Sequence, residues 1–187
     1  MQKIRSIVGA TLALAALSAA PAAAQTADRG ATLTVQGGGL SYDREGDGTF
    51  PMGAVRVDWA LNRYVRAEVG GSYARPETTG FRTIGQNLTE PFDSHSNLMT
   101  ATVGVQAQLP TRIASPYVGI ATGLFSRFDA EGGDRFFRPT QEVMAGVRVP
   151  VRGGIGIRGE LRYRLDQHQD GGTASDMEHT LGVTLKL

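Results

Sequence analysis

The sequence predicts an all-β protein, and within that class a single eight-stranded, antiparallel, up-and-down transmembrane β-barrel. Three observations support this prediction: an export-type amino terminus, eight segments that alternate apolar and polar residues, and connections that alternate between short and long. No stretch of the chain after its amino terminus shows a convincing helical period.

The amino terminus has the three parts of a secretory signal. Lys3 and Arg5 precede an apolar run over residues 7–20, and small residues suited to signal cleavage follow it. This run is short for a membrane-spanning helix, which disfavours the alternative of an amino-terminal anchor. We therefore predict a cleaved signal peptide over residues 1–24 and an outer-membrane β-barrel domain over residues 25–187.

Composition narrows the class further. Removal of the signal takes away two cations and no acid, so the formal net charge falls from +1 to −1. A near-neutral chain gives no electrostatic reason to expect nucleic acid. Without cysteine, it has no disulfide framework and no thiolate metal site. No later apolar run approaches 20 residues, so we predict no transmembrane helix. An exported chain without such a helix belongs to one of three classes: a periplasmic protein, a secreted protein or an outer-membrane barrel.

Strand-like segments occupy most of the mature chain. They lie near residues 31–42, 52–62, 64–74, 97–109, 116–128, 140–150, 154–166 and 177–187. Short turns alternate with long polar connections, near residues 43–51, 75–96, 129–139 and 167–176. Outer-membrane barrels have this layout, with short turns in the periplasm and long loops outside the cell. An even number of strands then places both termini on the periplasmic side.

The two faces of the predicted strands differ in charge. In the second strand, for example, Val55 and Val57 alternate with Arg56 and Asp58. On seven strands the apolar face holds no charged residue, whereas the polar face holds Arg56, Asp58, Arg66, Glu68, Glu142, Arg148, Arg158, Glu160, Arg162, Arg164 and Lys186. Arginine or lysine facing lipid at mid-depth costs about 2–4 kcal/mol, so a lipid-facing stripe should exclude both.

The first strand departs from this pattern. Leu33 and Val35 share one parity, but Leu40 and Tyr42 take the other. We predict a β-bulge at the three glycines of residues 37–39, which would reverse the faces.

Alternation alone does not say which face is outside, because a soluble periplasmic lipid-binding barrel would bury the apolar face. Two observations favour a membrane barrel. The polar face carries glycines, which make room in a narrow lumen. Aromatic residues of the apolar parity lie toward strand ends, where a lipid-facing girdle belongs: Trp59, Tyr73, Phe128 and Tyr163.

The chain resembles the OmpA-like and OmpX-like family of eight-stranded outer-membrane barrels. The resemblance rests on the signal of residues 1–24, the segment 115–123 (SPYVGIATG) and the closing segment 179–187 (HTLGVTLKL). It implies a location in the cell outer membrane, contact with outer-membrane lipids, and insertion by the barrel-assembly machinery. Members usually end on an aromatic residue, whereas this chain ends on Leu187.

The charges of the polar face should pair in the lumen, because an isolated enclosed charge is very costly. We expect pairs between adjacent strands: Arg56 and Asp58 with Arg66 and Glu68, and Glu142 and Arg148 with Arg158 and Glu160. The network would then be a structural plug that fixes register. The alternative is a narrow, porin-like channel with a slight preference for anions.

His95 and Ser96 invite comparison with lipid A deacylase barrels, which use histidine and serine. That family separates the two residues by one position, whereas here they are adjacent, so on a strand they point to opposite faces. We assign no catalytic residue, and a lipid-A-modifying enzyme remains an alternative.

No metal or cofactor site is predicted. Residues 43–48 (DREGDG) resemble the start of a calcium loop, but its twelfth position is Ala54 and not the required glutamate. His168 and His179 have no second ligand at suitable spacing.

The longest connection, residues 75–96, mixes apolar and polar residues and is the expected site for an extracellular ligand. The sequence thus predicts a non-enzymatic outer-membrane barrel with a structural or surface-interaction, adhesion-type role.

Overall fold

The computed structural model describes residues 30–42, 48–84, 88–129, 136–167 and 173–187. The predicted signal peptide, residues 1–24, lies outside them. The strands in the described part are β1 (Ala31–Tyr42), β2 (Thr49–Ala60), β3 (Val65–Ala74), β4 (Glu77–Ile84), β5 (Leu88–Gln108), β6 (Ser115–Asp129), β7 (Phe136–Arg152), β8 (Ile155–Gln167) and β9 (Thr173–Lys186). No helix among the described residues is long and apolar enough to cross a membrane.

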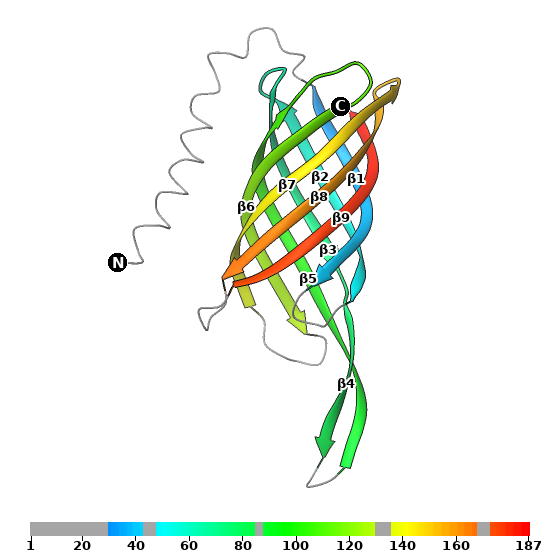
Figure 1. The fold of residues 1–187 in the computed structure, drawn as a ribbon, viewed down its shortest axis with the longest axis vertical. Coiled ribbons are helices and arrows are strands. Elements are labelled where there is room, and N and C mark those ends of the chain that lie inside the picture. The colour runs from blue at the N-terminus through cyan, green and yellow to red at the C-terminus, as the bar shows by residue number, and fades with distance from the viewer. Residues whose placement is uncertain (1–29, 43–47, 85–87, 130–135, 168–172) are drawn as a thin grey trace, which may run out of the picture.

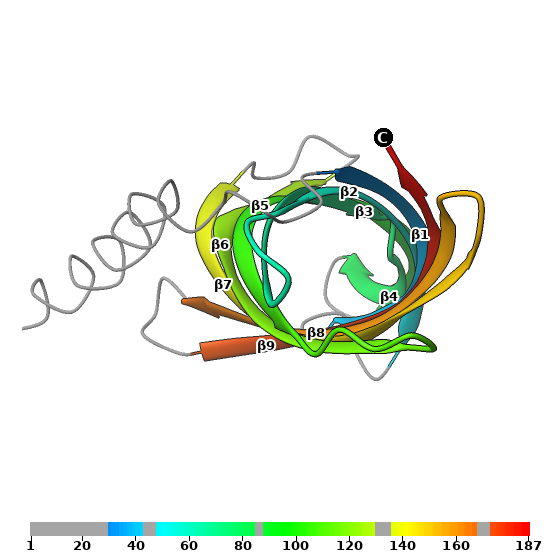
Figure 2. The same cartoon turned by 90° about the horizontal axis from the view of Figure 1, so that it is seen from above.

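Eight of these strands close into a ring (Figures 1 and 2). Each pairs antiparallel with its neighbours in chain order, β1 pairs with β9, and β3 pairs with β5 rather than with β4. Closure leaves no barrel strand with an unpaired edge, as a spanning structure in lipid requires. The predicted eight-stranded, antiparallel, up-and-down barrel is confirmed.

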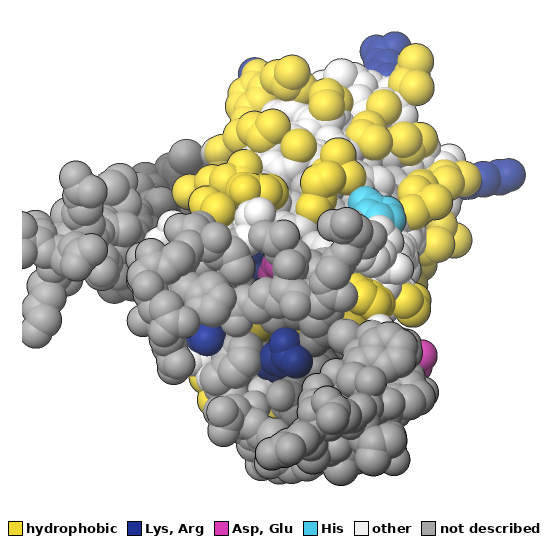
Figure 3. Space-filling view, turned by 60° about the horizontal axis from the view of Figure 1, so that its bottom comes forward, with side chains coloured by type: hydrophobic (Ala, Val, Ile, Leu, Met, Phe, Trp, Pro, Cys, Tyr) yellow, Lys and Arg dark blue, Asp and Glu magenta, His cyan; other side chains and the backbone are white. Residues whose placement is uncertain are grey.

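The barrel is inverted relative to a soluble protein. Val103 and Leu161 point outward with 45% and 53% of their surface exposed, whereas Arg56 and Arg158 point inward and are 1% and 0% exposed. Figure 3 shows hydrophobic side chains over the visible outer wall. Water would drive these side chains inward, so the arrangement is stable only where hydrocarbon surrounds the barrel.

The two ends of the barrel differ. One end, here the short-turn end, carries the turns at residues 61–64, 109–114 and 153–154; the opposite end is the long-loop end. Gly153 and Gly154 have φ of 62° and 81°, which suits a two-residue hairpin turn.

The bulge predicted at residues 37–39 is absent, and the prediction was wrong. Pairing of β1 with β2 and with β9 runs without a register shift from one end to the other. Leu40 breaks the apolar pattern for another reason: it points inward and is 2% exposed, in an apolar layer inside the barrel.

The connection predicted over residues 75–96 is also different from expectation, because much of it is strand. β4 pairs with the first part of β5, from Glu77 with His95 to Ile84 with Leu88. The register matches that of β3 with β5, and Pro76 accepts a hydrogen bond from the Ser96 amide at 3.2 Å between them. Pro76 has no amide hydrogen, which interrupts the ladder without shifting it. The hairpin extends beyond the barrel (Figure 1).

Candidate functional site

The candidate site is the lumen, and β8 contributes most of its charge. Alternate residues of a strand point to one face, so Arg158, Glu160, Arg162 and Arg164 occupy successive inward positions. All four are buried. Ion pairs in the described part of the chain join six arginines to six carboxylates, which are Arg56, Arg66, Arg148, Arg158, Arg162 and Arg164 with Asp58, Glu68, Glu142, Glu160, Asp176 and Glu178.

At the centre of the network, Glu160 contacts three guanidinium groups. Arg162 Nε lies 2.7 Å from Glu160 Oε1, Arg56 Nε lies 3.1 Å from the same oxygen, and Arg158 contacts Oε2. Glu68 on β3 pairs with Arg158 at 2.6 Å and also with Arg162. These contacts connect strands on different sides of the barrel, so the network fills the cross-section.

A second group of ion pairs lies toward the long-loop end. Arg162 pairs with Glu142 at 2.9 Å. Arg164 pairs with Glu142 at 3.2 Å, with Asp176 at 3.6 Å and with Glu178. Each buried acid in this group contacts at least one arginine, which offsets the cost of enclosing it.

A third group lies toward the short-turn end around Asp58. Arg66 pairs with it directly, while Arg148 and Arg158 each approach Asp58 Oδ2 at 3.6 Å. Tyr117 supports the arrangement: its hydroxyl accepts a hydrogen bond from Arg158 Nε at 2.7 Å, and the guanidinium of Arg148 lies 4.3 Å from its ring centroid.

An apolar layer crosses the lumen near the long-loop end. It consists of the buried side chains Leu40, Met52, Ala54, Ala74, Leu98 and Phe125, with Phe50 packed against them. The guanidinium carbon of Arg164 lies 5.2 Å from the centroid of the Phe125 ring, so the layer packs directly against the charges. The sequence analysis had placed Ala54 on the inward face but had not predicted an apolar layer there.

The predicted lumen residues fall into three groups. Arg56, Asp58, Glu68, Glu142, Arg158, Glu160, Arg162 and Arg164 are buried; Arg66 and Arg148 are half-buried; Lys186 is exposed at the short-turn end. Asp58 pairs with Arg66 on the adjacent strand as expected, but many other pairs cross the lumen. Glu142 pairs with the adjacent strand β8 through Arg162 and Arg164 rather than through the predicted Arg158, and Arg148 pairs with Asp58 rather than with the predicted Glu160. That the network has a structural role stays a prediction.

Sequence reasoning missed part of the network. Asp176 and Glu178 are buried inward positions of β9 that an extension of the alternation beyond Thr180 would have found. Gln106 was assigned to the polar face without a role; it donates to Glu68 at 2.6 Å and accepts from Arg148. These two acids reduce the excess of cations in the predicted set from three to one, which weakens the case for an anion-preferring channel.

The predicted girdle residues lie on the outer wall. Trp59, Tyr73 and Tyr163 are exposed, and Phe128 is half-buried. The Tyr73 hydroxyl donates to Asn97 Oδ1 at 2.7 Å, and Phe128 meets Phe137 edge-to-face with ring centroids 5.8 Å apart. Their contact with lipid stays a prediction.

Other sequence candidates contribute no assembled site to the described part of the chain. The side chain of His95, residues 43–47 and His168 lie outside it. His179 is exposed on the outer wall, and the described residues contain no group of three potential metal ligands.

The barrel has apolar side chains on its outer surface and a lumen filled with paired charges. These features define an eight-stranded outer-membrane β-barrel. Residues 10–186 match the family model described as outer membrane protein beta-barrel domain, and the chain belongs to that family. It is accordingly a protein of the outer membrane. No curated protein sequence matches the chain.

Solved structures share the fold at low sequence identity. Neisserial surface protein A is 15% identical with a TM-score of 0.61, covering 84% of this chain and 96% of its own. Ail of Yersinia pestis, in complex with the heparin analogue sucrose octasulfate, is 12% identical with a TM-score of 0.52, covering 84% and 97%. The amino-terminal β-barrel domain of Pseudomonas aeruginosa OprF is 12% identical with a TM-score of 0.52, covering 83% and 97%.

Proposed function

We propose that this protein is a closed, non-enzymatic barrel that presents the β4–β5 hairpin at the cell surface for interaction with an extracellular partner. The observation that carries the proposal is the contrast between a lumen filled with paired charge and a strand pair that continues past the barrel in unbroken register.

The filled lumen supports an anchoring role. The ion pairs around Glu160 span the cross-section, and the apolar layer lies above them toward the long-loop end. Eight-stranded barrels have an interior that side chains can fill. A rigid, filled barrel holds a projecting hairpin in a fixed orientation, which lowers the conformational cost of binding.

The orientation supports surface presentation. In barrels of this type the short turns face the periplasm and the long connections face the exterior. The β4–β5 hairpin leaves the barrel at the long-loop end (Figure 1). Its two strands are hydrogen-bonded to each other, so their backbone is ordered before any partner arrives.

Charge indicates the kind of partner. The long connections and their strand ends, residues 43–48, 75–96, 129–135 and 166–172, hold eleven acids against four arginines. This excess favours a partner with a basic surface. It argues against transferring to this chain the sulfated ligand seen with Ail.

Hairpin truncation tests the proposal. An Asn-Gly turn replaces residues 77–95, joining Pro76 to Ser96, which already face each other in register. In the matched control the same dipeptide replaces only residues 85–87, so both strands remain. Attachment of expressing bacteria is measured on surfaces coated with a basic protein (cytochrome c), with an acidic protein (serum albumin) and with heparin.

We expect attachment to the basic protein to fall about tenfold with truncation, to persist in the control and to weaken with salt. Both variants should retain heat-modifiable migration on gels, which reports a folded barrel. Equal attachment of native and truncated protein to all three surfaces would contradict the proposal.

The second candidate, a narrow channel, is tested by planar-bilayer recording of the purified protein. Reproducible single-channel steps would favour it. We expect none, because the six arginines and six carboxylates of the lumen neutralise one another and fill the cross-section, which leaves no path for a solute.

A further inference from the structure

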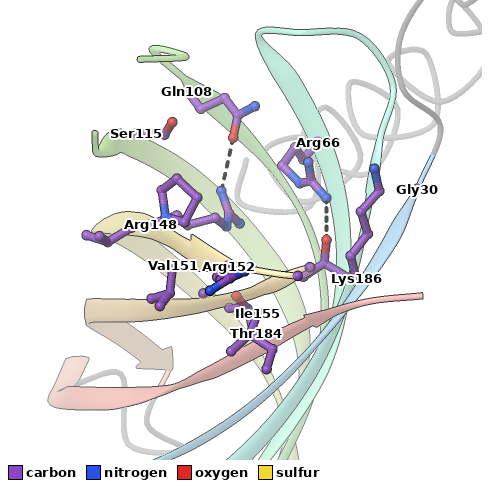
Figure 4. Close-up of a pocket in the computed structure, with 16 residues that line it drawn as sticks. Gly30, Arg66, Gln108, Ser115, Arg148, Val151, Arg152, Ile155, Thr184 and Lys186 are labelled. Carbon is purple, nitrogen blue, oxygen red and sulfur yellow. Dashed lines mark hydrogen bonds between the residues drawn. The ribbon is translucent and has the colours of Figure 1, made fainter. Parts of the chain in front are cut away.

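We propose that the short-turn end of the barrel holds a binding site for a phosphate group. A recess of about 400 Å³ opens there, and its lining includes Arg66, Arg148, Arg152 and Lys186 (Figure 4). These residues come from β3, β7 and β9, so the site exists only in the closed barrel.

The recess is strongly cationic. Four basic side chains line it, and none of the described aspartates and glutamates does. The carboxylate that pairs with Arg66 and Arg148 is Asp58, which is completely buried and also approaches Arg158. One carboxylate thus faces two lining arginines, and Arg152 and Lys186 add further positive charge at the rim.

Arg148 is held in place before a ligand binds. Its guanidinium lies 4.3 Å from the Tyr117 ring centroid, and its Nη1 donates to Gln108 Oε1 at 3.2 Å. Its Nε is a buried donor for which the described residues provide no hydrogen-bond acceptor. The contacts with Tyr117 and Gln108 thus hold the guanidinium in one place, which lowers the cost of ordering it around an anion.

Arg66 is fixed in the same way on the opposite side of the recess. Its Nη2 donates to Thr32 Oγ1 at 2.9 Å while it pairs with Asp58. Figure 4 shows Arg66 and Lys186 on one side of the recess and Arg148 with Gln108 on the other. Charged groups on both sides suit a compact anion with several oxygens rather than a single carboxylate.

The surroundings allow two sources of that phosphate. Val151 and Ile155 also line the recess, and both are exposed on the outer wall. A phospholipid could therefore place its acyl chains beside these residues with its phosphate among the arginines. Free phosphate or a soluble phosphate ester could reach the same groups from the aqueous side.

The experiment uses the purified mature protein in octyl glucoside, a detergent without phosphate. Calorimetric titration compares inorganic phosphate, dioctanoyl-phosphatidylglycerol and dioctanoylglycerol, which has the same chains and no phosphate. Two double variants are compared with the native protein. R152A/K186A removes two lining cations, whereas R63A/R112A removes two cations from turns at the same end that do not line the recess.

We expect phosphatidylglycerol, inorganic phosphate or both to bind, and dioctanoylglycerol not to bind. R152A/K186A should raise the dissociation constant at least about tenfold, and R63A/R112A should change it less than about twofold. Binding of inorganic phosphate alone indicates the soluble source, and binding of the lipid alone indicates the membrane source.

Absence of binding by both phosphate compounds would overturn the proposal. Equal weakening in the two double variants would also overturn it, because a diffuse positive end and not the recess would then attract the anion. Heat-modifiable migration of both variants establishes that each remains a folded barrel.

Discussion

Arg162 on β8 forms an ion pair with Glu68 on β3, although these strands share no hydrogen-bonded edge. β8 pairs with β7 and β9, whereas β3 pairs with β2 and β5. The side chains therefore join parts of the wall that the backbone ladder connects only around the circumference. Both are buried, so neither charge has water as an alternative partner.

Removal of one partner from this pair should be strongly destabilising. R162M leaves Glu68, Glu142 and Glu160 short of a cation and should lower the free energy of unfolding by about 3–5 kcal/mol. The double variant R162M/E68M should lose less than the sum of the two single variants. Urea unfolding in lipid vesicles measures these values, and additivity within about 0.5 kcal/mol would show that the pair is not coupled.

Arginine on the outer wall should carry a cost that depends on depth. Leu161 lies midway along β8, whereas Val151 adjoins the short turn at residues 153–154. L161R should lower the free energy of unfolding by about 2–4 kcal/mol and V151R by about 0–1 kcal/mol. The same unfolding assay compares them. Similar costs at the two positions would place both at one depth, against the present assignment.

The interior requires glycine where Tyr117 crosses the lumen. A Cβ atom added to Gly146 would lie 2.5 Å from the Gly159 carbonyl oxygen and 2.6 Å from Tyr117 Cζ, whereas one added to Gly159 on the neighbouring strand would meet nothing closer than 3.9 Å. G146A should therefore cost about 1–3 kcal/mol and G159A less than about 0.5 kcal/mol. Equal stability of the two variants would mean that the Tyr117 ring and the β8 backbone do not enclose Gly146 as the structure places them.

Period-two alternation could predict much of the fold, because each barrel strand has one face in lipid and one in the lumen. It placed β1 at its observed bounds and put Arg158 and Leu161 on opposite faces. Alternation predicts which face of a strand a side chain occupies, but it does not predict whether the neighbouring side chains on that face are charged or apolar. Leu40 was therefore misread as evidence of a bulge, when it belongs to an apolar layer inside the lumen.

The pairing of the lumen charges could not be predicted in full. Sequence patterns identify neighbours along a ladder, so Asp58 with Arg66 was foreseeable. The pair between Arg162 and Glu68 depends on barrel diameter and strand stagger, which no local pattern contains. The β4–β5 hairpin was missed because Pro76 and the polar residues after it are typical of a loop.

The central claim is that hydrocarbon contacts the apolar wall, and the single tryptophan of the chain tests it directly. Trp59 lies on the outer wall of β2 with 40% of its surface exposed. In vesicles, phospholipids with brominated chains should quench its fluorescence strongly, most of all when bromine lies near the headgroup, and aqueous acrylamide should quench it weakly. Strong acrylamide quenching without quenching by brominated lipid would place Trp59 in water and contradict the account.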